Sequence, residues 1–281
     1  MASIQIAAAL QSPFHLKNHQ KTMTDKNVCE NEIAFFAATA KDFWDEKGSF
    51  AALHRMNPCR LEAIVSRIIY HFERDHATDN PLSGLKILDI GCGGGMVCEP
   101  LARLGAQVTG LDLAEDLLEV ARLHAADQGL EVDYRALSAE ELAQKEVGAF
   151  DVVLALEILE HLPNPSDFIE SIKTLVNPQG LSAISTLNRS PQAYIGAILI
   201  AERVLRWLPK GAHHYKQFIT PEELTSMSEK AGLDVEETLG LVYNPLEDHW
   251  SLDSQNCSVN YISFLKNYQA APPIKPPLSW V

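Results

Sequence analysis

The residues Lys86-Ile87-Leu88-Asp89-Ile90-Gly91-Cys92-Gly93-Gly94-Gly95 decide the fold of this 281-residue chain. The run 86–90 predicts a buried strand, and four glycines follow it within five residues. A second strand-like run, 107–111, is followed by Asp112. Two strands joined through a glycine-rich turn, with an acid after the second, are typical of a nucleotide-binding βαβ unit.

Strand-like and helix-like segments alternate along the rest of the chain. The strands are predicted at 86–90, 107–111, 132–135, 150–156 and 181–186, with helices between them at 96–104, 114–128, 139–145 and 165–175. This alternation predicts an α/β fold with a mostly parallel sheet and helices on both faces. Strands at 233–239 and 260–265 would complete a seven-stranded sheet as an antiparallel C-terminal hairpin. Between the fifth and sixth strands, Thr220-Pro221-Glu222-Glu223 is a helix-start signal.

The flanking segments have compositions of their own. We expect residues 1–30 to be a disordered tail or a targeting extension and residues 270–281 to be a proline-rich tail. Residues 31–269 would form a single domain. Its N-terminal helical lid (31–75) would contain helices at 33–44 and 59–72 joined by an irregular loop, and residues 190–216 would be an apolar helical insertion.

Charge and cysteine content narrow the classes of function. The formal net charge is −14, whereas nucleic-acid binders more commonly carry a basic surface, so we expect no nucleic-acid partner. The five cysteines are scattered and form no C-x-x-C pair, which is typical of reduced thiols in a reducing compartment. No apolar run reaches the roughly 18 residues of a transmembrane helix.

The residues around the glycine turn indicate which nucleotide it binds. Glycines such as Gly91 and Gly93 let the backbone approach a ligand closely, and Asp112 is placed to accept hydrogen bonds from ribose hydroxyls. Residue 96 is Met where a dinucleotide-binding turn carries its third glycine. The carboxylate of Asp89 can face the ammonium group of a methionine moiety, whereas it would repel a pyrophosphate. These features favour S-adenosylmethionine over NAD.

The same motifs resemble those of a known enzyme class. Residues 88–95 look like motif I of class I S-adenosylmethionine-dependent methyltransferases, and residues 151–161 look like their fourth-strand motif. More specifically, the chain resembles the ubiquinone biosynthesis O-methyltransferase family over about residues 32–266. Six segments carry this resemblance: Leu53-His54-Arg55-Met56-Asn57-Pro58, Gly91-Cys92-Gly93-Gly94-Gly95, Glu157-Ile158-Leu159-Glu160-His161, Ser185-Thr186-Leu187-Asn188-Arg189, Pro209-Lys210-Gly211-Ala212-His213 and Val242-Tyr243-Asn244-Pro245.

The resemblance implies a Rossmann-like class I methyltransferase fold and a specific activity. The enzyme would methylate the phenolic hydroxyl of a polyprenyl hydroxyphenol intermediate and of demethylubiquinol, within a ubiquinone-biosynthesis complex. Arg60 would bind the carboxylate of S-adenosylmethionine, and Leu156, where many relatives have Met, would pack against the cofactor. The full predicted cofactor set is Arg60, Asp89, Gly91, Gly93, Asp112 and Leu156.

Glu157, Glu160 and His161 form a candidate metal site after the fourth strand. Their spacing places two carboxylates and an imidazole near one side of a helical turn, where they could bind a divalent ion. The resemblance implies that this ion is Mg²⁺, which would act as a Lewis acid on the phenol oxygen. The alternative is that Glu160 and His161 cap the helix and shape the substrate floor. Without a metal, His161 is the best candidate base.

The apolar segment 193–208 predicts contact with membrane lipid. Basic residues group at one end, and Trp207 suits the headgroup boundary. The alternative is a helix buried in the core or lid. Peripheral association would place the protein in the cytoplasm on the inner membrane, or on the matrix side of the mitochondrial inner membrane.

Three other functions remain compatible with the motifs. The chain could methylate another small phenolic or acid substrate, or bind S-adenosylmethionine as a non-catalytic scaffold. On fold grounds alone it could also be an NAD-dependent oxidoreductase.

Overall fold

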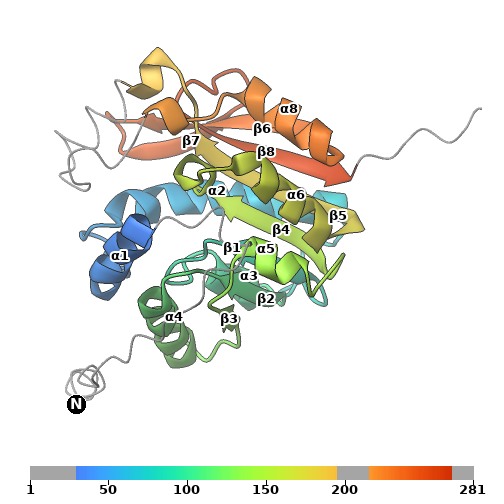
Figure 1. Cartoon of the computed structure of the whole chain (residues 1–281). Coiled ribbons are helices and arrows are strands. Elements are labelled where there is room, and N and C mark those ends of the chain that lie inside the picture. Colours follow the sequence, from blue (N-terminus) through green and yellow to red (C-terminus); the bar gives the residue numbers. More distant parts are fainter. Residues whose placement is uncertain (1–29, 195–214, 268–281) are drawn as a thin grey trace, which may run out of the picture.

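The structure, a computed structural model, describes residues 30–194 and 215–267. The predicted tails and most of the predicted insertion at 190–216 lie outside these residues. Within them, one eight-stranded sheet has the order β3-β2-β1-β4-β5-β8-β6-β7 (Figure 1). The strands are β1 (Lys86–Ile90), β2 (Gln107–Leu111), β3 (Asp133–Arg135), β4 (Phe150–Leu156), β5 (Val176–Leu187), β6 (Leu233–Asn244), β7 (His249–Asp253) and β8 (Asn260–Asn267).

The sheet is parallel in its first part and antiparallel in its last part. Strands β3, β2, β1, β4 and β5 pair in parallel, and β8 then pairs antiparallel with both β5 and β6. The predicted mixed sheet with antiparallel C-terminal strands is therefore confirmed. The carboxyl ends of β1, β2 and β4 meet at one edge, which brings Asp89, Asp112 and Glu157 to the same end of the molecule.

The predicted number of strands was too low by one. Strand β7 forms an antiparallel hairpin with β6, in which Tyr243 faces Trp250. It lies at the outer edge of the sheet, and three of its five residues are exposed. An edge strand of this kind lacks the buried alternating face that identifies a strand in a sequence.

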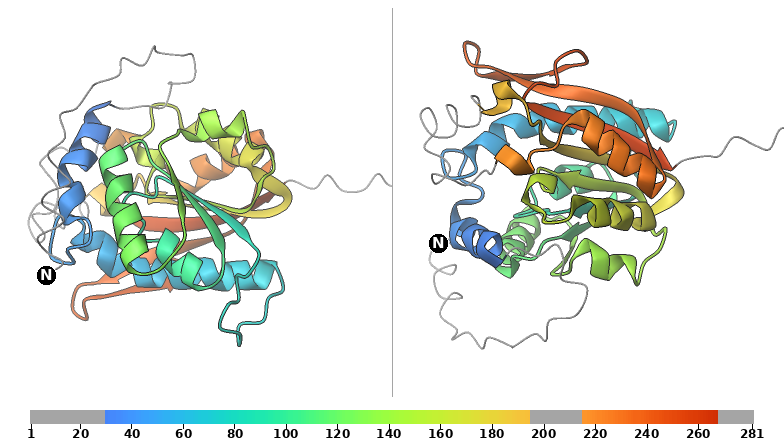
Figure 2. Two further views of the ribbon diagram at one scale, coloured as in Figure 1. Left: turned by 90° about the horizontal axis from the view of Figure 1, so that it is seen from below. Right: turned by 45° about the horizontal axis from the view of Figure 1, so that its top comes forward.

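Helices cover both faces of the sheet (Figures 1 and 2). The first hydrophobic core packs α2 (Ala51–His71), α3 (Cys98–Arg103) and α4 (Glu115–Asp127) against alternate residues of the central strands. The second core packs α5 (Ala139–Ala143), α6 (Pro165–Leu175) and α8 (Pro221–Ala231) against the opposite face. The start of α8 is as predicted: Thr220 and Glu223 form a capping box, and Gly232 ends the helix in the left-handed conformation.

The N-terminal lid is more helical than the sequence suggested. Helix α1 (Glu30–Thr39) continues into a 3₁₀ turn, η3 (Ala40–Asp42). Helix α2 begins at Ala51, so the predicted irregular loop was wrong for residues 51–58. Pro58 lies inside α2, although proline removes a helical hydrogen bond and usually breaks a helix interior. The buried residues Met56, Asn57 and Arg60 on either side of Pro58 anchor this part of the helix to the rest of the fold.

Candidate functional site

The glycine turn after β1 is tied to the end of β2. The amides of Gly91 and Cys92 both donate to the carbonyl of Leu111, at 2.8 and 2.9 Å. Gly91, Gly93 and Gly95 have φ angles of 74°, 54° and 89°, a left-handed region in which side chains are strained. Glycine therefore lets the turn adopt this shape without the strain that a side chain would add.

Asp112 closes the turn from the end of β2. Its Oδ2 accepts a hydrogen bond from the amide of Gly93 at 2.9 Å, and its Oδ1 accepts one from the amide of Ala114 at 2.8 Å. Burial raises the pKa of this carboxyl group, and the amides of Ala114 and Gly93 oppose that shift. The structure thus brings Asp112 to the glycine turn, and its contact with ribose stays a prediction.

Arg60 approaches the same edge from the lid and is 4% exposed. Its Nη2 donates to Asn57 Oδ1 at 3.0 Å, and Asn57 Nδ2 in turn donates to the carbonyl of Met96 at 3.1 Å. Arg60 Nε and Nη1 are buried and have no hydrogen-bond partner among the described residues. Buried polar groups are normally satisfied, so two unused guanidinium donors fit a bound carboxylate.

Asp89 supplies the opposite charge next to this guanidinium. The side chain is 2% exposed, and its Oδ2 accepts a hydrogen bond from Cys98 Sγ at 3.3 Å. Burial raises the pKa of Asp89 to about 7, while the Cys98 hydrogen bond and the charge of Arg60 oppose this shift. A buried acid and a buried guanidinium that interact electrostatically complement the ammonium and carboxylate groups of an amino acid. S-adenosylmethionine carries both of these groups.

Leu156 and the turn after it form the next wall. Leu156 ends β4 and is 8% exposed. Glu157 has a φ of 54°, which is uncommon outside glycine. A Cβ on Gly91 would lie 2.8 Å from Ile158 Cδ1, so the β4 turn packs directly on the glycine turn. The structure therefore brings together all six residues of the predicted cofactor set at one edge of the sheet.

The lid covers the glycine turn with an aromatic ring that the sequence did not reveal. A Cβ on Gly94 would lie 2.3 Å from Phe43 Cδ1, and one on Gly93 would lie 3.0 Å from Phe43 Cε2. Phe43 also packs with Phe50 and Met96 in a small core of its own. These contacts are long-range, and an aromatic residue after a helix gives no local signal of them.

A second aromatic contact ties the lid to α4. The ring of Trp44 stacks on His124, with centroids 3.7 Å apart and planes at 9°. His124 Nδ1 lies 2.6 Å from Oε1 of the buried Glu99 on α3. The lid is thus held to the parallel half of the fold by two neighbouring aromatic side chains.

The two acids after β4 are held by the Ser185–Thr186 pair on β5. Ser185 Oγ donates to Glu157 Oε1 at 2.7 Å, and Thr186 Oγ1 donates to Glu160 Oε2 at 2.6 Å. Glu157 Oε2 accepts a further hydrogen bond from Asn260 Nδ2 at 3.2 Å. Glu160 is 4% exposed, and burial followed by repulsion from Glu157 raises its pKa to about 7.

The predicted Mg²⁺ site is not supported by this geometry. Glu160 and His161 lie in the 3₁₀ turn η4 (Leu159–His161), whereas Glu157 precedes it with a left-handed backbone. The two carboxylates accept hydrogen bonds from hydroxyl and amide donors on β5 and β8. Across residues 30–194 and 215–267, no three His, Cys, Asp or Glu side chains are grouped so that they could hold a metal ion.

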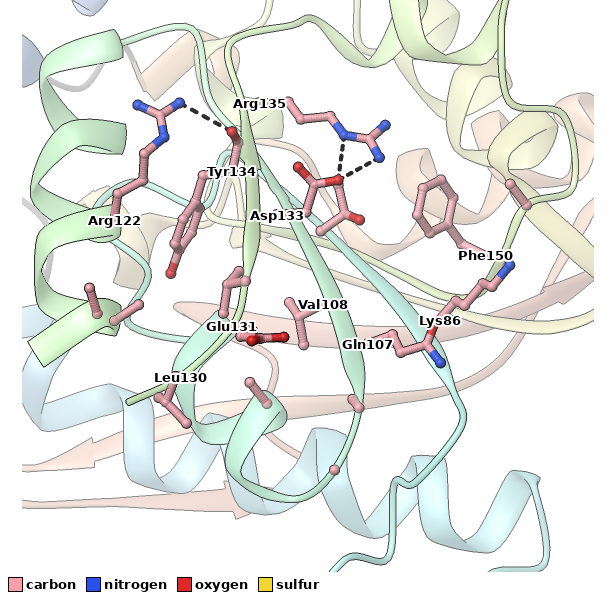
Figure 3. Close-up of a pocket in the computed structure, with 18 of the residues that line it drawn as sticks. Lys86, Gln107, Val108, Arg122, Leu130, Glu131, Asp133, Tyr134, Arg135 and Phe150 are labelled. Atoms are coloured by element: carbon pink, nitrogen blue, oxygen red, sulfur yellow. Dashed lines mark hydrogen bonds and ion pairs between the residues drawn. The ribbon is translucent and has the colours of Figure 1, made fainter. Parts of the chain in front are cut away.

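The surface also contains a hollow of ≈ 920 Å³, which lies along β2 and β3 and reaches the first residues of β1 and β4 (Figure 3). Its wall includes Lys86, Gln107 and Phe150, which begin β1, β2 and β4. Among its cationic side chains, Arg135 is paired with Asp133 and Glu146. None of the predicted site residues lines this hollow, so it is separate from the cofactor site at the carboxyl ends of the strands.

Comparison with known proteins identifies the family. Residues 52–238 match the family model described as a methyltransferase domain. The chain is 49% identical over 236 residues to the ubiquinone biosynthesis O-methyltransferase of Roseobacter denitrificans, covering 84% of this chain and 95% of the relative. The corresponding protein of Ruegeria pomeroyi is 49% identical over 237 residues, with the same coverage.

Solved structures show the same fold at low sequence identity. Magnesium protoporphyrin IX methyltransferase from Synechocystis, with bound S-adenosylmethionine, has a TM-score of 0.56 at 18% identity, covering 89% of this chain and 100% of that one. A Thermotoga maritima S-adenosylmethionine-dependent methyltransferase has a TM-score of 0.58 at 14% identity, covering 84% and 99%. The chain therefore belongs to the ubiquinone biosynthesis O-methyltransferase family, within the S-adenosylmethionine-dependent methyltransferases.

Proposed function

We propose that this enzyme transfers a methyl group from S-adenosylmethionine to the phenolic hydroxyl of a polyprenyl hydroxyphenol intermediate and of demethylubiquinol. The observation that carries the proposal is the 49% identity to relatives named ubiquinone biosynthesis O-methyltransferase, over 84% of this chain. The buried charges of Arg60 and Asp89 support it, because they complement the amino-acid group of the methyl donor.

The chain's own residues would bind and orient the two reactants. Arg60 would hold the carboxylate of the donor, Asp89 its ammonium group and Asp112 its ribose. When bound, the donor supplies an electrophilic methyl group: an acceptor oxygen bonds to the methyl carbon, the carbon–sulfur bond breaks, and its electron pair returns to sulfur. Orientation is the main contribution of the protein to such a reaction.

The acceptor proton must leave during the transfer, and His161 is our proposed base. It lies beside the two acids, in the 3₁₀ turn that follows β4. We expect His161→Asn to lower kcat about 100-fold, as for loss of a general base, with unchanged affinity for S-adenosylhomocysteine. An unchanged kcat would remove His161 from this role.

We assign no step to Mg²⁺, because Glu157, Glu160 and His161 do not form a group that could hold a metal ion. Turnover measured with Mg²⁺ and with a chelator tests the requirement directly. Loss of activity in chelator that added Mg²⁺ restores would reinstate the metal prediction, with these three residues as its ligands.

Membrane contact and assembly into a ubiquinone-biosynthesis complex are part of the proposal. A polyprenylated acceptor partitions into a bilayer, so the enzyme would associate peripherally with the inner membrane, on its cytoplasmic or matrix side. None of the helices among residues 30–194 and 215–267 has the length and apolar character needed to span a bilayer. Co-flotation with liposomes tests contact through the insertion: we expect Ile198→Glu with Leu199→Glu to reduce it, and equal flotation would contradict this.

Methyl transfer to a short-chain demethylubiquinol analogue is the decisive experiment. We expect turnover of the analogue and binding of S-adenosylhomocysteine in isothermal titration. Binding without transfer to any phenol would favour the scaffold alternative. Transfer to other small phenols or acids but not to the analogue would favour a different substrate.

A further inference from the structure

Glu157 has an amide partner that lies far from it in the sequence. Asn260 begins β8, 103 residues further along the chain, and its Nδ2 donates to Glu157 Oε2 at 3.2 Å. Antiparallel pairing places Asn260 opposite Leu187 on β5, beside the Ser185 hydroxyl that donates to Glu157 Oε1. The two oxygens of one carboxylate are therefore held by two different strands.

The backbone of Glu157 is fixed as firmly as its side chain. Its φ of 54° is unfavourable for a residue with a Cβ, and such conformations persist where the surroundings determine them. The amide of Glu157 donates to the carbonyl of Ser185 at 2.9 Å. Together with the bonds from Ser185 Oγ and Asn260 Nδ2, this restrains Glu157 at its backbone and at both oxygens of its carboxylate.

The position of Glu157 relates it to the methyl donor. It follows Leu156 directly, its neighbour Ile158 packs on Gly91, and its charge acts on the guanidinium of Arg60. Glu157 thus lies at the rim of the cofactor site. A carboxylate has about four acceptor positions, and Ser185 and Asn260 occupy two, so Glu157 can still accept a hydrogen bond from an acceptor hydroxyl.

We infer that Asn260 is a positioning residue, which holds the carboxylate of Glu157 towards the acceptor hydroxyl so that the acceptor oxygen is aligned with the methyl group. The inference rests on the proposed function, since it names how that site orients its acceptor. Asn260 acts through Glu157 and does not itself contact the reacting atoms. Losing it would let the carboxylate turn away, and a misplacement of about 1 Å can lower a rate about 100-fold.

The chain offers a matched control on the same strand. Asn267 is the last residue of β8 and lies at the other end of this strand from Asn260. It is also buried, and its Nδ2 donates to the carbonyl of Asn177 at 2.6 Å. Replacing Asn267 removes a buried amide from β8 without touching Glu157. An effect specific to the site must therefore appear for Asn260 and be absent for Asn267.

The test is a double-mutant cycle in kcat with Asn260→Ala and Glu157→Gln, using whichever phenol the wild-type enzyme methylates. Wild-type turnover of the demethylubiquinol analogue reports on the proposed function alone, whereas the cycle reports on Asn260. We expect Asn260→Ala to lower kcat about 10- to 100-fold, with KM for S-adenosylmethionine and affinity for S-adenosylhomocysteine within about twofold of wild type. Because Asn260 acts through Glu157, it should cause no further loss in the Glu157→Gln background.

Two further variants separate positioning from folding. Asn260→Asp keeps the shape but replaces the donor by a second carboxylate, so it should lower kcat at least as much as Asn260→Ala. Asn260→Ser retains a hydroxyl donor and should recover part of the lost rate, while Asn267→Ala should leave kcat within about twofold of wild type. The inference would be overturned if the two single-variant losses in kcat multiplied in the double variant. It would also be overturned if Asn267→Ala lowered kcat as much as Asn260→Ala.

Discussion

Arg60 is almost fully buried and yet incompletely hydrogen-bonded, and this makes it the most direct residue to test. Replacing it by Met removes Nε and Nη1, the two donors without a partner in the described residues. Hydrogen bonds to charged groups contribute about 1.5–3 kcal/mol. We therefore expect Arg60→Met to weaken binding of S-adenosylhomocysteine about 10- to 100-fold in isothermal titration.

Arg55 provides the control for this measurement, since it lies on the same helix. Its side chain is 44% exposed and pairs with Asp248 at 3.2 Å. An exposed ion pair contributes little, so Arg55→Met should bind S-adenosylhomocysteine like wild type. Equal weakening in the two variants would show that a loss of positive charge on α2, and not a specific contact, had been measured.

Asp89 predicts how cofactor binding depends on pH. Because burial raises its pKa to about 7, the free enzyme holds the carboxyl group mostly protonated at pH 6 and mostly ionised at pH 8. Only the ionised form attracts the ammonium group of the ligand. Affinity for S-adenosylhomocysteine should therefore rise about tenfold from pH 6 to pH 8.

In the Asp89→Asn variant, the affinity for S-adenosylhomocysteine should be weaker than in the wild type. It should also no longer rise between pH 6 and pH 8. If the variant keeps the wild-type pH profile, another group controls binding. The measurement is isothermal titration in buffers of equal ionic strength, since screening alters the interaction between charges.

At the scale of elements, the lid and the glycine turn fit each other closely. Gly94 lies in an ordinary backbone conformation, yet a Cβ there would come within 2.3 Å of Phe43 Cδ1. Phe43 is buried and packs on Phe50, with centroids 4.7 Å apart, so its ring cannot move without disturbing the lid. We expect Gly94→Ala to destabilise the protein by about 1–3 kcal/mol, as overpacking does, measured by urea unfolding.

Phe43→Ala provides the background that isolates this clash. In that background the added methyl group meets no ring. Gly94→Ala should therefore lower the free energy of unfolding little beyond the effect of Phe43→Ala alone. If Gly94→Ala lowers the free energy of unfolding as much in the Phe43→Ala protein as in the wild type, the strain lies in the turn itself and not at the contact with the lid.

The elements that the sequence failed to predict share a physical cause. Helix α2 was expected to start after Pro58, since proline lacks the amide that a helix interior needs. The buried side chains Asn57 and Arg60 support the helix through this position, and they are satisfied only in three dimensions. Strand β7 was missed because it is an exposed edge strand. In both cases tertiary contacts overrode the local pattern.

At the scale of the whole molecule, the site is assembled from segments that lie far apart in the sequence. The cofactor set was predictable because Asp89, Gly91 and Asp112 belong to short motifs that end parallel strands, and those ends meet at one edge of any such sheet. Phe43 and Asn260 were not predictable, because each reaches the site through packing or antiparallel pairing with a distant element. The Mg²⁺ prediction relied on the spacing of Glu157, Glu160 and His161 and on the family resemblance, and neither determines the backbone conformation of Glu157 or the hydrogen bonds of its carboxylate.

This assembly predicts which parts of the protein a bound cofactor stabilises. A ligand that joins Arg60 on α2 to Asp89 on β1 must dissociate before the lid can leave the glycine turn. Local opening should then become rarer by a factor of 1 + [L]/Kd, about 100-fold when the free ligand is at 100 times Kd. Hydrogen–deuterium exchange with saturating S-adenosylhomocysteine should therefore slow at residues 43–60 and 91–96, and not at α8, which packs in the second core, on the opposite face of the sheet from α2. In Arg60→Met at the same free ligand concentration the slowing at residues 43–60 should largely disappear. Equal slowing across the fold, α8 included, would instead indicate that the ligand stabilises the fold globally and that the lid does not open as a separate unit.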